Sequence, residues 1–213
     1  MMKKAIQKNA MLLAAFAVSC TAMVGFVHLG TKDTIKLQEQ QQLLRTLGDV
    51  IAPERHDNLI FNDCVLIDNE LLGNGTQKAY LARKNDQAVA AAITATAPDG
   101  YNGNIHIMVA VNYDGTVSGV RTLKHQETPG LGDKIELKKD NWILSFNGKQ
   151  IDGDNDSRWA VAKDGGMFDQ FTGATITPRA VVKAVHKTVT YFNAEKENLF
   201  SSEHNCGAQQ SDV

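Results

Sequence analysis

The sequence of 213 residues lacks several features that define common functional classes. Lys and Arg number 22 and Asp and Glu number 24, so the net charge is −2 and no basic excess points to nucleic acid. Cysteine occurs only at positions 20, 64 and 206, without a C-x-x-C pair or a Cys/His cluster. This pattern argues against a metal or iron–sulfur centre held by the protein. No serine elbow or reactive cysteine accompanies His125, so no hydrolytic triad is predicted.

Charged residues are also missing between Lys8 and Lys32. The 21 residues from 10 to 30 are mostly apolar. As a helix rising about 1.5 Å per residue, they would span a hydrocarbon layer about 30 Å thick. Lys3, Lys4 and Lys8 precede this stretch, so the positive-inside rule places the N-terminus in the cytoplasm and the remainder on the far side. The sequence therefore predicts an N-terminal anchor with an exported domain.

Two other interpretations of this stretch remain open. A cleaved signal peptide would use residues 14–17 as its apolar core, and a lipoprotein signal would end at Cys20. We favour an uncleaved anchor because apolar residues continue to Leu29, which blurs any cleavage site. The span contains no Asp, Glu, Lys or Arg, so we expect no ion path within it.

Export also changes the interpretation of the cysteines. In an oxidising compartment, Cys64 and Cys206 could form a disulfide, for which chain-entropy models give about 4–5 kcal/mol when the closed loop is long. Two buried thiols are the alternative. The expected organisation is a cytoplasmic N-terminus at 1–9, an anchor at 10–31, a stalk helix at 32–53, an exported domain at 54–200 and a tail at 201–213.

The exported domain is predicted to be α+β, with a mostly antiparallel sheet and packed helices. Alternating or apolar runs bounded by turn residues predict strands at 61–68, 78–84, 87–97, 105–112 and 116–123. Asp114-Gly115 is a strong hairpin signal, and residues 84–87 are predicted to form the hairpin turn between the second and third strands. Residues 97–103 are predicted to form a loop rich in turn residues. Residues 131–146 should contain a short helix, and the acidic turn at 152–156 lacks the Glu of a calcium loop.

The stretch from 169 to 178 places three threonines, a glycine and an alanine ahead of a predicted helix. Thr177 is expected to be the N-cap, with Pro178 at the first helical position. The helix would bury one apolar face, formed by Val181, Val185, Val189 and Phe192. Free N–H groups and hydroxyls at a helix start favour a phosphate, although a capped helix after an ordinary turn has the same pattern.

A second unusual stretch, from 125 to 134, places a proline and two glycines in close order. Such a loop lets the backbone approach a ligand closely, although a surface turn is the simpler interpretation of this stretch alone. Together, the Glu-Thr-Pro-Gly-Leu-Gly run at 127–132 and the Thr-Gly-Ala-Thr-Ile-Thr run at 172–177 resemble the covalent FMN-binding domain. That domain occurs in the C subunit of the sodium-pumping NADH:quinone oxidoreductase and in the G subunit of the Rnf electron-transport complex. The length, the single anchor and the Ala-Pro-Asp-Gly-Tyr loop at 97–101 are more similar to the Rnf proteins of this family.

The resemblance implies a function and a set of site residues. Thr175 would carry FMN as a phosphate ester, attached by a separate flavin transferase that uses FAD. The protein would relay electrons in a complex that couples NADH–ferredoxin chemistry to ion translocation across the inner membrane, with its domain in the periplasm. Its partners would be the other Rnf subunits. The expected FMN-binding residues are Thr175, Thr172, Gly173, Ala174, Thr177, Glu127, Thr128, Gly130, Leu131, Gly132 and Lys134.

Three other functions are weighed against this one. The principal alternative is a non-redox anchored scaffold or assembly protein of the cell envelope, in which both stretches are ordinary turns. A stand-alone flavoprotein reductase would be active without membrane partners. A hydrolase or transferase acting by itself would need a nucleophile–base pair, and none is evident. We expect no independent catalytic site.

Overall fold

The computed structural model describes residues 2–153, 156–203 and 205–206. It consists of two compact units, Met1–Arg45 and Thr46–Val213, which are described separately. The first α-helix, α1, runs over Met2–Val50, so the residues expected to form the anchor and those expected to form the stalk up to Val50 belong to one helix. Within the tail expected at 201–213, residue 204 and residues 207–213 lie outside the described part of the chain.

The first unit is a helix whose apolar side chains point away from any protein core. Within α1, the segment Ile6–Val50 is long and apolar enough to cross a membrane. Phe16 is 70% exposed and Phe26 is 83% exposed, which suits an environment of lipid rather than water. The hydroxyls of Ser19 and Thr21 each donate a 2.8 Å hydrogen bond to the carbonyl four residues earlier, so these polar groups remain satisfied in an apolar surrounding.

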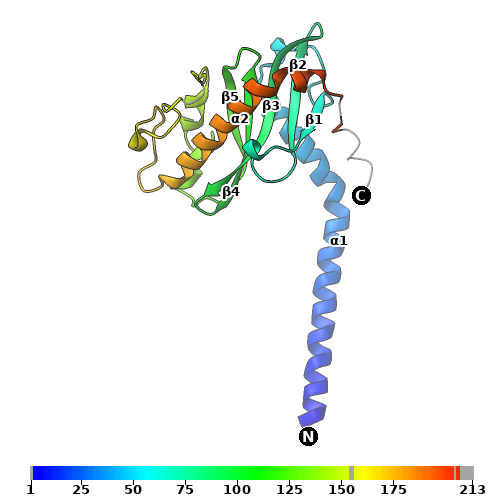
Figure 1. Cartoon of the computed structure of the whole chain (residues 1–213). Coiled ribbons are helices and arrows are strands. Elements are labelled where there is room, and N and C mark those ends of the chain that lie inside the picture. Colours follow the sequence, from blue (N-terminus) through cyan, green and yellow to red (C-terminus); the bar gives the residue numbers. More distant parts are fainter. Residues whose placement is uncertain (1, 154–155, 204, 207–213) are drawn as a thin grey trace. The chain divides into compact units, whose positions relative to one another are not determined.

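The second unit contains a five-stranded antiparallel sheet in the order β1-β2-β3-β4-β5 (Figure 1). The predicted α+β class is confirmed. Asn85 and Asp86 have φ values of 51° and 62°, which suit the two-residue hairpin turn between β2 and β3. Gly115, with φ +91°, serves the β4–β5 hairpin that the sequence predicted. The strands are β1 (Cys64–Ile67), β2 (Gln77–Lys84), β3 (Gln87–Gly100), β4 (Gly103–Asn112) and β5 (Val117–Lys124).

The expected loop at 97–103 is wrong. β3 continues to Gly100 and β4 begins at Gly103, so only a two-residue turn separates them. The register shifts between Ala97 and Gly100, and this irregularity explains how Pro98 is tolerated, because a proline cannot donate to a regular ladder. The tight turn projects Tyr101 and Asn102 from the end of the sheet.

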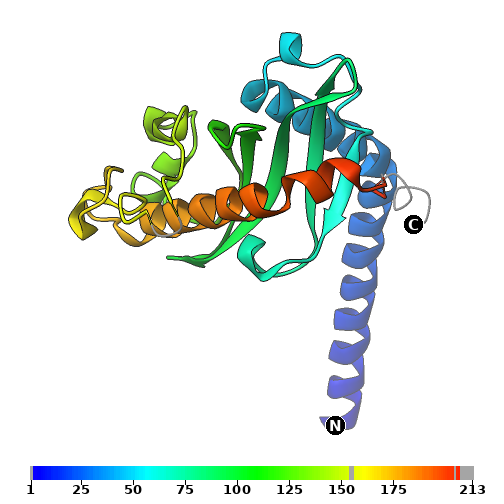
Figure 2. The same ribbon diagram turned by 45° about the horizontal axis from the view of Figure 1, so that its top comes forward.

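Helix α2 (Ile176–Ser201) covers one face of the sheet and packs against β3 and β4 (Figures 1 and 2). Its predicted apolar face is confirmed, since Val181, Val185, Val189 and Phe192 are fully buried. On the other face, β5 contacts Val50, the last residue of α1, which belongs to the second unit. Val50 lies directly over Gly119 of β5, where an added Cβ would come within 3.1 Å of the Val50 Cα.

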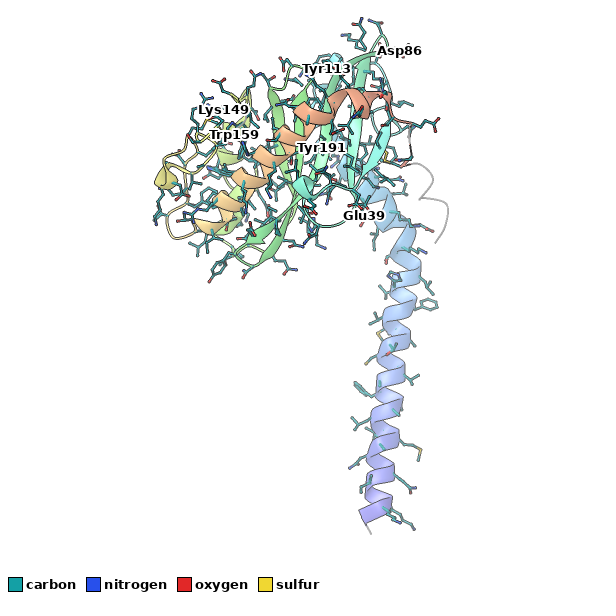
Figure 3. The ribbon with its side chains drawn as sticks, in the orientation of Figure 1. Glu39, Asp86, Tyr113, Lys149, Trp159 and Tyr191 are labelled. Carbon is teal, nitrogen blue, oxygen red and sulfur yellow. A yellow bond between two sulfur atoms is a disulfide. The ribbon has the colours of Figure 1, made fainter. Side chains whose placement is uncertain are left out.

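Between β5 and α2, the chain forms short 3-10 helices and an aromatic cluster instead of further sheet. The side chains of this cluster form edge-on, tilted and stacked contacts, with centroid separations from 4.5 to 6.3 Å; they are Trp142, Phe146, Trp159, Phe168 and Phe171. Figure 3 shows Trp159 among the loops beside α2. The Trp142 Nε1–H donates to the Asp169 carbonyl at 2.8 Å, which fixes the chain just before the helix start. The 3-10 helices of the domain are Pro53–Arg55, Glu70–Leu72, Gly132–Ile135, Asn141–Phe146 and Ala162–Asp164.

The chain returns to the edge strand β1 after α2. Cys64 and Cys206 form a disulfide in the structure, with Cα atoms 5.6 Å apart. Asn205 adds two hydrogen bonds: its N–H donates to the Cys64 carbonyl at 3.2 Å, and its Oδ1 accepts from the Leu66 N–H at 2.7 Å. These contacts satisfy backbone groups that an edge strand would otherwise leave open.

Candidate functional site

A tight turn leads into α2. The Ala174 N–H donates to the Phe171 carbonyl at 3.1 Å, and Gly173 at the third position has φ +81°. A residue with a Cβ adopts this left-handed conformation only at a cost, so glycine is required by the turn itself. Thr172 is exposed at the corner of the turn.

The predicted N-cap is wrong by two residues. Thr175 is the N-cap, and α2 begins at Ile176, which puts Thr177 and Pro178 inside the first turn. Pro178 remains harmless there because the first four N–H groups of a helix have no intrahelical partner. Thr175 makes no side-chain capping bond. Thr175 is half-buried at the start of a 26-residue helix, and its hydroxyl has no hydrogen-bond partner among the described residues.

Thr177 is unavailable as a cap because its hydroxyl donates to Glu127 Oε2, fifty residues earlier in the chain. The other oxygen of this carboxylate, Oε1, accepts the Asn102 N–H at 3.0 Å. Glu127 is only 4% exposed. It therefore joins three segments that are distant in sequence: the β3–β4 turn, the loop at 125–132 and the first turn of α2.

His125 supports this loop, a role that we did not predict. Its Nδ1 accepts the Glu127 N–H at 3.0 Å, and its Nε2 lies 2.6 Å from Glu136 Oε1. Because Nδ1 is the acceptor, the neutral ring carries its proton on Nε2 and donates it to Glu136. The Thr128 carbonyl accepts the Leu131 N–H at 3.1 Å, which closes the loop.

The three segments surround a cavity of about 290 Å³. It brings together eight of the predicted residues and adds Tyr101 and Ile176, while Thr172, Gly130 and Lys134 lie outside its lining. The lining residues are Tyr101, Glu127, Thr128, Leu131, Gly132, Gly173, Ala174, Thr175, Ile176 and Thr177. Tyr101, Leu131 and Ile176 are 65%, 43% and 46% exposed, so apolar surface borders the cavity.

Two surface ion pairs flank the first turns of α2. Arg179 donates to Asp164 through Nε at 2.6 Å and Nη2 at 2.8 Å, and Lys183 donates to Asp99 at 2.7 Å. The hydrogen bonds from these cations hold the pKa values of the Asp164 and Asp99 carboxyls below their usual range. Because both pairs are exposed, they contribute little stability, but they link neighbouring segments to the helix.

Comparison with known families first defines the class. A family model described as FMN-binding domain matches residues 100–190, a range that contains every residue lining the cavity. A second, described as RnfG N-terminal region, matches residues 1–50. The chain thus has an FMN-binding domain behind a candidate membrane-spanning helix.

Relatives identify the particular family. The protein from Shewanella loihica is 52% identical over 98% of this chain and 99% of its own length. Those from Vibrio atlanticus and Pseudoalteromonas atlantica are 53% and 49% identical over 98% of this chain, covering 100% and 98% of their own lengths. Each is named as the G subunit of an ion-translocating oxidoreductase complex. The chain belongs to this family of G subunits, which confirms the resemblance found in the sequence.

The residues around the cavity fit an FMN. Gly132 and Gly173 have no side chain that would narrow the space between residues 127–132 and 172–177. A Cβ at Gly132 would lie 2.8 Å from Thr177 Oγ1, and one at Gly173 would lie 3.6 Å from Leu131 Cδ2. The N-terminal end of α2 offers free N–H groups and a favourable dipole for a phosphate. The apolar border suits the flat ring system of the flavin.

Proposed function

We propose that this chain is the membrane-anchored flavoprotein subunit of an ion-translocating oxidoreductase complex, and that it carries FMN covalently on Thr175. Bound FMN would supply reversible electron transfer. The chain would hold the flavin, exclude part of the surrounding water and relay electrons beside the other Rnf subunits. We infer an N-terminus in the cytoplasm and a periplasmic domain in the cell inner membrane, from the lysines ahead of the span.

The observation that carries the proposal is the environment of the Thr175 hydroxyl. It makes no capping bond, lines the cavity and lies at a helix start, where a phosphate would be stabilised. Thr177, in contrast, is 1% exposed and bonded to Glu127, and Thr172 lies outside the cavity. Thr175 is therefore the hydroxyl best placed for modification.

Attachment would need a second enzyme, because a threonine hydroxyl is a weak nucleophile without an adjacent base. A flavin transferase would use FAD as co-substrate. The Thr175 oxygen would form a bond to the phosphorus on the FMN side, the pyrophosphate P–O bond would break, and AMP would leave while the hydroxyl proton is released. The fixed turn at 171–174 would present Thr175 to that enzyme.

Denaturing gels viewed under ultraviolet light would test the attachment, with the full chain expressed in the presence and absence of a flavin transferase. We expect yellow fluorescence that survives denaturation only when the transferase is present, and an intact mass increased by one FMN less one water. Thr175→Val should abolish the signal and Thr175→Ser should retain it.

Two further threonines provide controls. Thr172→Val should reduce the signal without abolishing it, and Thr190→Val, on the exposed side of the same helix, should leave it unchanged. A fluorescent Thr175→Val protein would contradict the proposal. Absence of any signal from the wild type would instead favour the scaffold alternative.

The orientation needs a separate measurement. Protease added to spheroplasts should degrade the domain, because only the outer face of the inner membrane is accessible to it. If degradation occurs only after the membrane is lysed, the domain is cytoplasmic and the proposed orientation is wrong. Co-purification from membranes would identify the partner subunits, and a protein that is active alone would favour the stand-alone reductase.

A further inference from the structure

Glu127 is a buried carboxylate beside the cavity, and among the described residues it has no cation as partner. Its oxygens accept the Asn102 N–H at 3.0 Å and the Thr177 hydroxyl, and the side chain is nearly inaccessible to solvent. None of the salt bridges between described residues involves Glu127. A buried carboxylate without a counter-cation is costly unless hydrogen bonds or a function compensate for it.

Two glycines lie close to this carboxylate. A Cβ at Gly132 would lie 2.9 Å from Glu127 Oε2, and a Cβ at Gly100 would lie 3.0 Å from Oε1. Both separations are too short for an ordinary carbon contact. A Cβ at Gly100 would also clash with the Gly103 carbonyl oxygen, so neither position leaves space for a side chain beside the carboxylate. The surrounding backbone therefore confines the Glu127 head group to one place at the cavity wall.

We propose that Glu127 acts electrostatically on the bound FMN: its negative charge keeps the midpoint potential of the flavin low. This inference rests on the proposed function. Both carboxylate oxygens already accept hydrogen bonds from protein donors, so Glu127 acts on the flavin through its charge rather than as a direct ligand. Reduction adds electrons to the flavin, and a negative charge held in a poorly hydrated wall opposes that addition.

The alternative is a purely structural role, in which Glu127 only holds the three segments together. Two substitutions separate the two roles. Glu127→Gln removes the charge and keeps the shape: the amide oxygen can accept the Asn102 N–H, and the amide N–H can donate to the Thr177 hydroxyl. Thr177→Val removes one hydrogen bond to the carboxylate and keeps its charge.

The experiment uses the full chain in detergent, loaded with FMN by a flavin transferase. Redox titration followed by flavin absorbance gives the midpoint potential, and thermal unfolding of the flavin-free variants gives the Tm. We expect Glu127→Gln to shift the potential to more positive values with a small change in Tm. We expect Thr177→Val to lower the Tm and to shift the potential less than Glu127→Gln does, because the charge of Glu127 is retained.

Additional variants test the same effect of charge if Glu127→Gln does not take up flavin. Glu127→Asp retains the charge and should keep the potential near that of the wild type. Thr128 lines the same cavity, so Thr128→Asp should lower the potential relative to Thr128→Asn. Thr190→Val is the control for substitution elsewhere on α2.

Some results would overturn the inference. These are an unchanged potential in Glu127→Gln, an equal positive shift in Thr177→Val, or equal potentials in the two Thr128 variants. They differ from a failure of the proposed function, which would appear as a wild-type protein that carries no covalent flavin at all.

Discussion

The crowding around Gly132 gives a prediction whose size follows from the structure. A methyl group at this position would meet Thr177 Oγ1 at 2.8 Å, Glu127 Oε2 at 2.9 Å and Glu127 Cβ at 3.0 Å. The Gly132 backbone is not left-handed, so the cost of Gly132→Ala comes from contact alone. Overpacking of this kind costs about 1–3 kcal/mol. The reduced freedom of the unfolded chain offsets about 0.4–1 kcal/mol.

The net destabilisation expected for Gly132→Ala is therefore about 1–2 kcal/mol. In domains of about 150–250 residues, each 1 kcal/mol changes the Tm by about 2–4 °C, so the Tm should fall by about 2–8 °C. Thermal unfolding followed by near-ultraviolet circular dichroism would measure this change. The same variant should also take up less FMN, since Glu127 and Thr177 must move apart to admit the methyl group.

Gly48→Ala is a control of opposite sign. Gly48 lies in the last turn of α1, and its added Cβ would approach Pro53 Cγ no closer than 4.0 Å. Alanine is favoured over glycine in a helix by about 1 kcal/mol, so this variant should be at least as stable as the wild type. If Gly132→Ala unfolds at or above the wild-type Tm, the close contact between Gly132, Glu127 and Thr177 is incorrect.

Three further predictions concern the rest of the domain. Phe192→Ala should lower the free energy of unfolding by about 3–5 kcal/mol, because it leaves a cavity at a fully buried site between α2 and the sheet. Thr190→Val should change it by no more than about 0.5 kcal/mol, and a denaturant titration of each variant would measure these values. Cys64→Ser and Cys206→Ser should each cost about 2–5 kcal/mol under oxidising conditions, while Cys20→Ser should leave domain stability unchanged; equal stability of all three variants would argue against the bridge. Because the pKa of Asp164 is lowered in the folded state, its ion pair stabilises the domain above the unfolded-state pKa of about 3.9, and this stability is lost as the pH falls through the folded-state pKa. The Tm of Asp164→Asn should therefore lie below that of the wild type at pH 7, and the two Tm values should converge in acid.

Local signals in the sequence predicted most of the sheet. Asp114-Gly115 and the turn at 84–87 identified two hairpins, because the backbone conformation of a two-residue turn depends mainly on the residues within it. The apolar spacing of α2 likewise identified its buried face. These features depend on residues that are close together in the chain.

Contacts between distant residues limited the prediction of the site. Thr177 has the sequence character of an N-cap, yet its hydroxyl is taken by Glu127, which no local pattern reveals. Tyr101 lines the cavity because the neighbouring Asn102 N–H donates to the Glu127 carboxylate, 25 residues away in the sequence. The hydrogen bonds of His125 to its own loop and to Glu136 also required the folded structure.

The unbonded hydroxyl of Thr175 has a consequence for the biogenesis of the protein. Most N-cap side chains hold the first turn of their helix, and a chemical group added to such an oxygen would remove that support. Here Thr177 and Glu127 secure the first turn instead, and Thr175 contributes only its backbone. The proposed ester on Thr175 would therefore leave the helix start intact. Folding of the domain and attachment of the flavin could then proceed as independent steps.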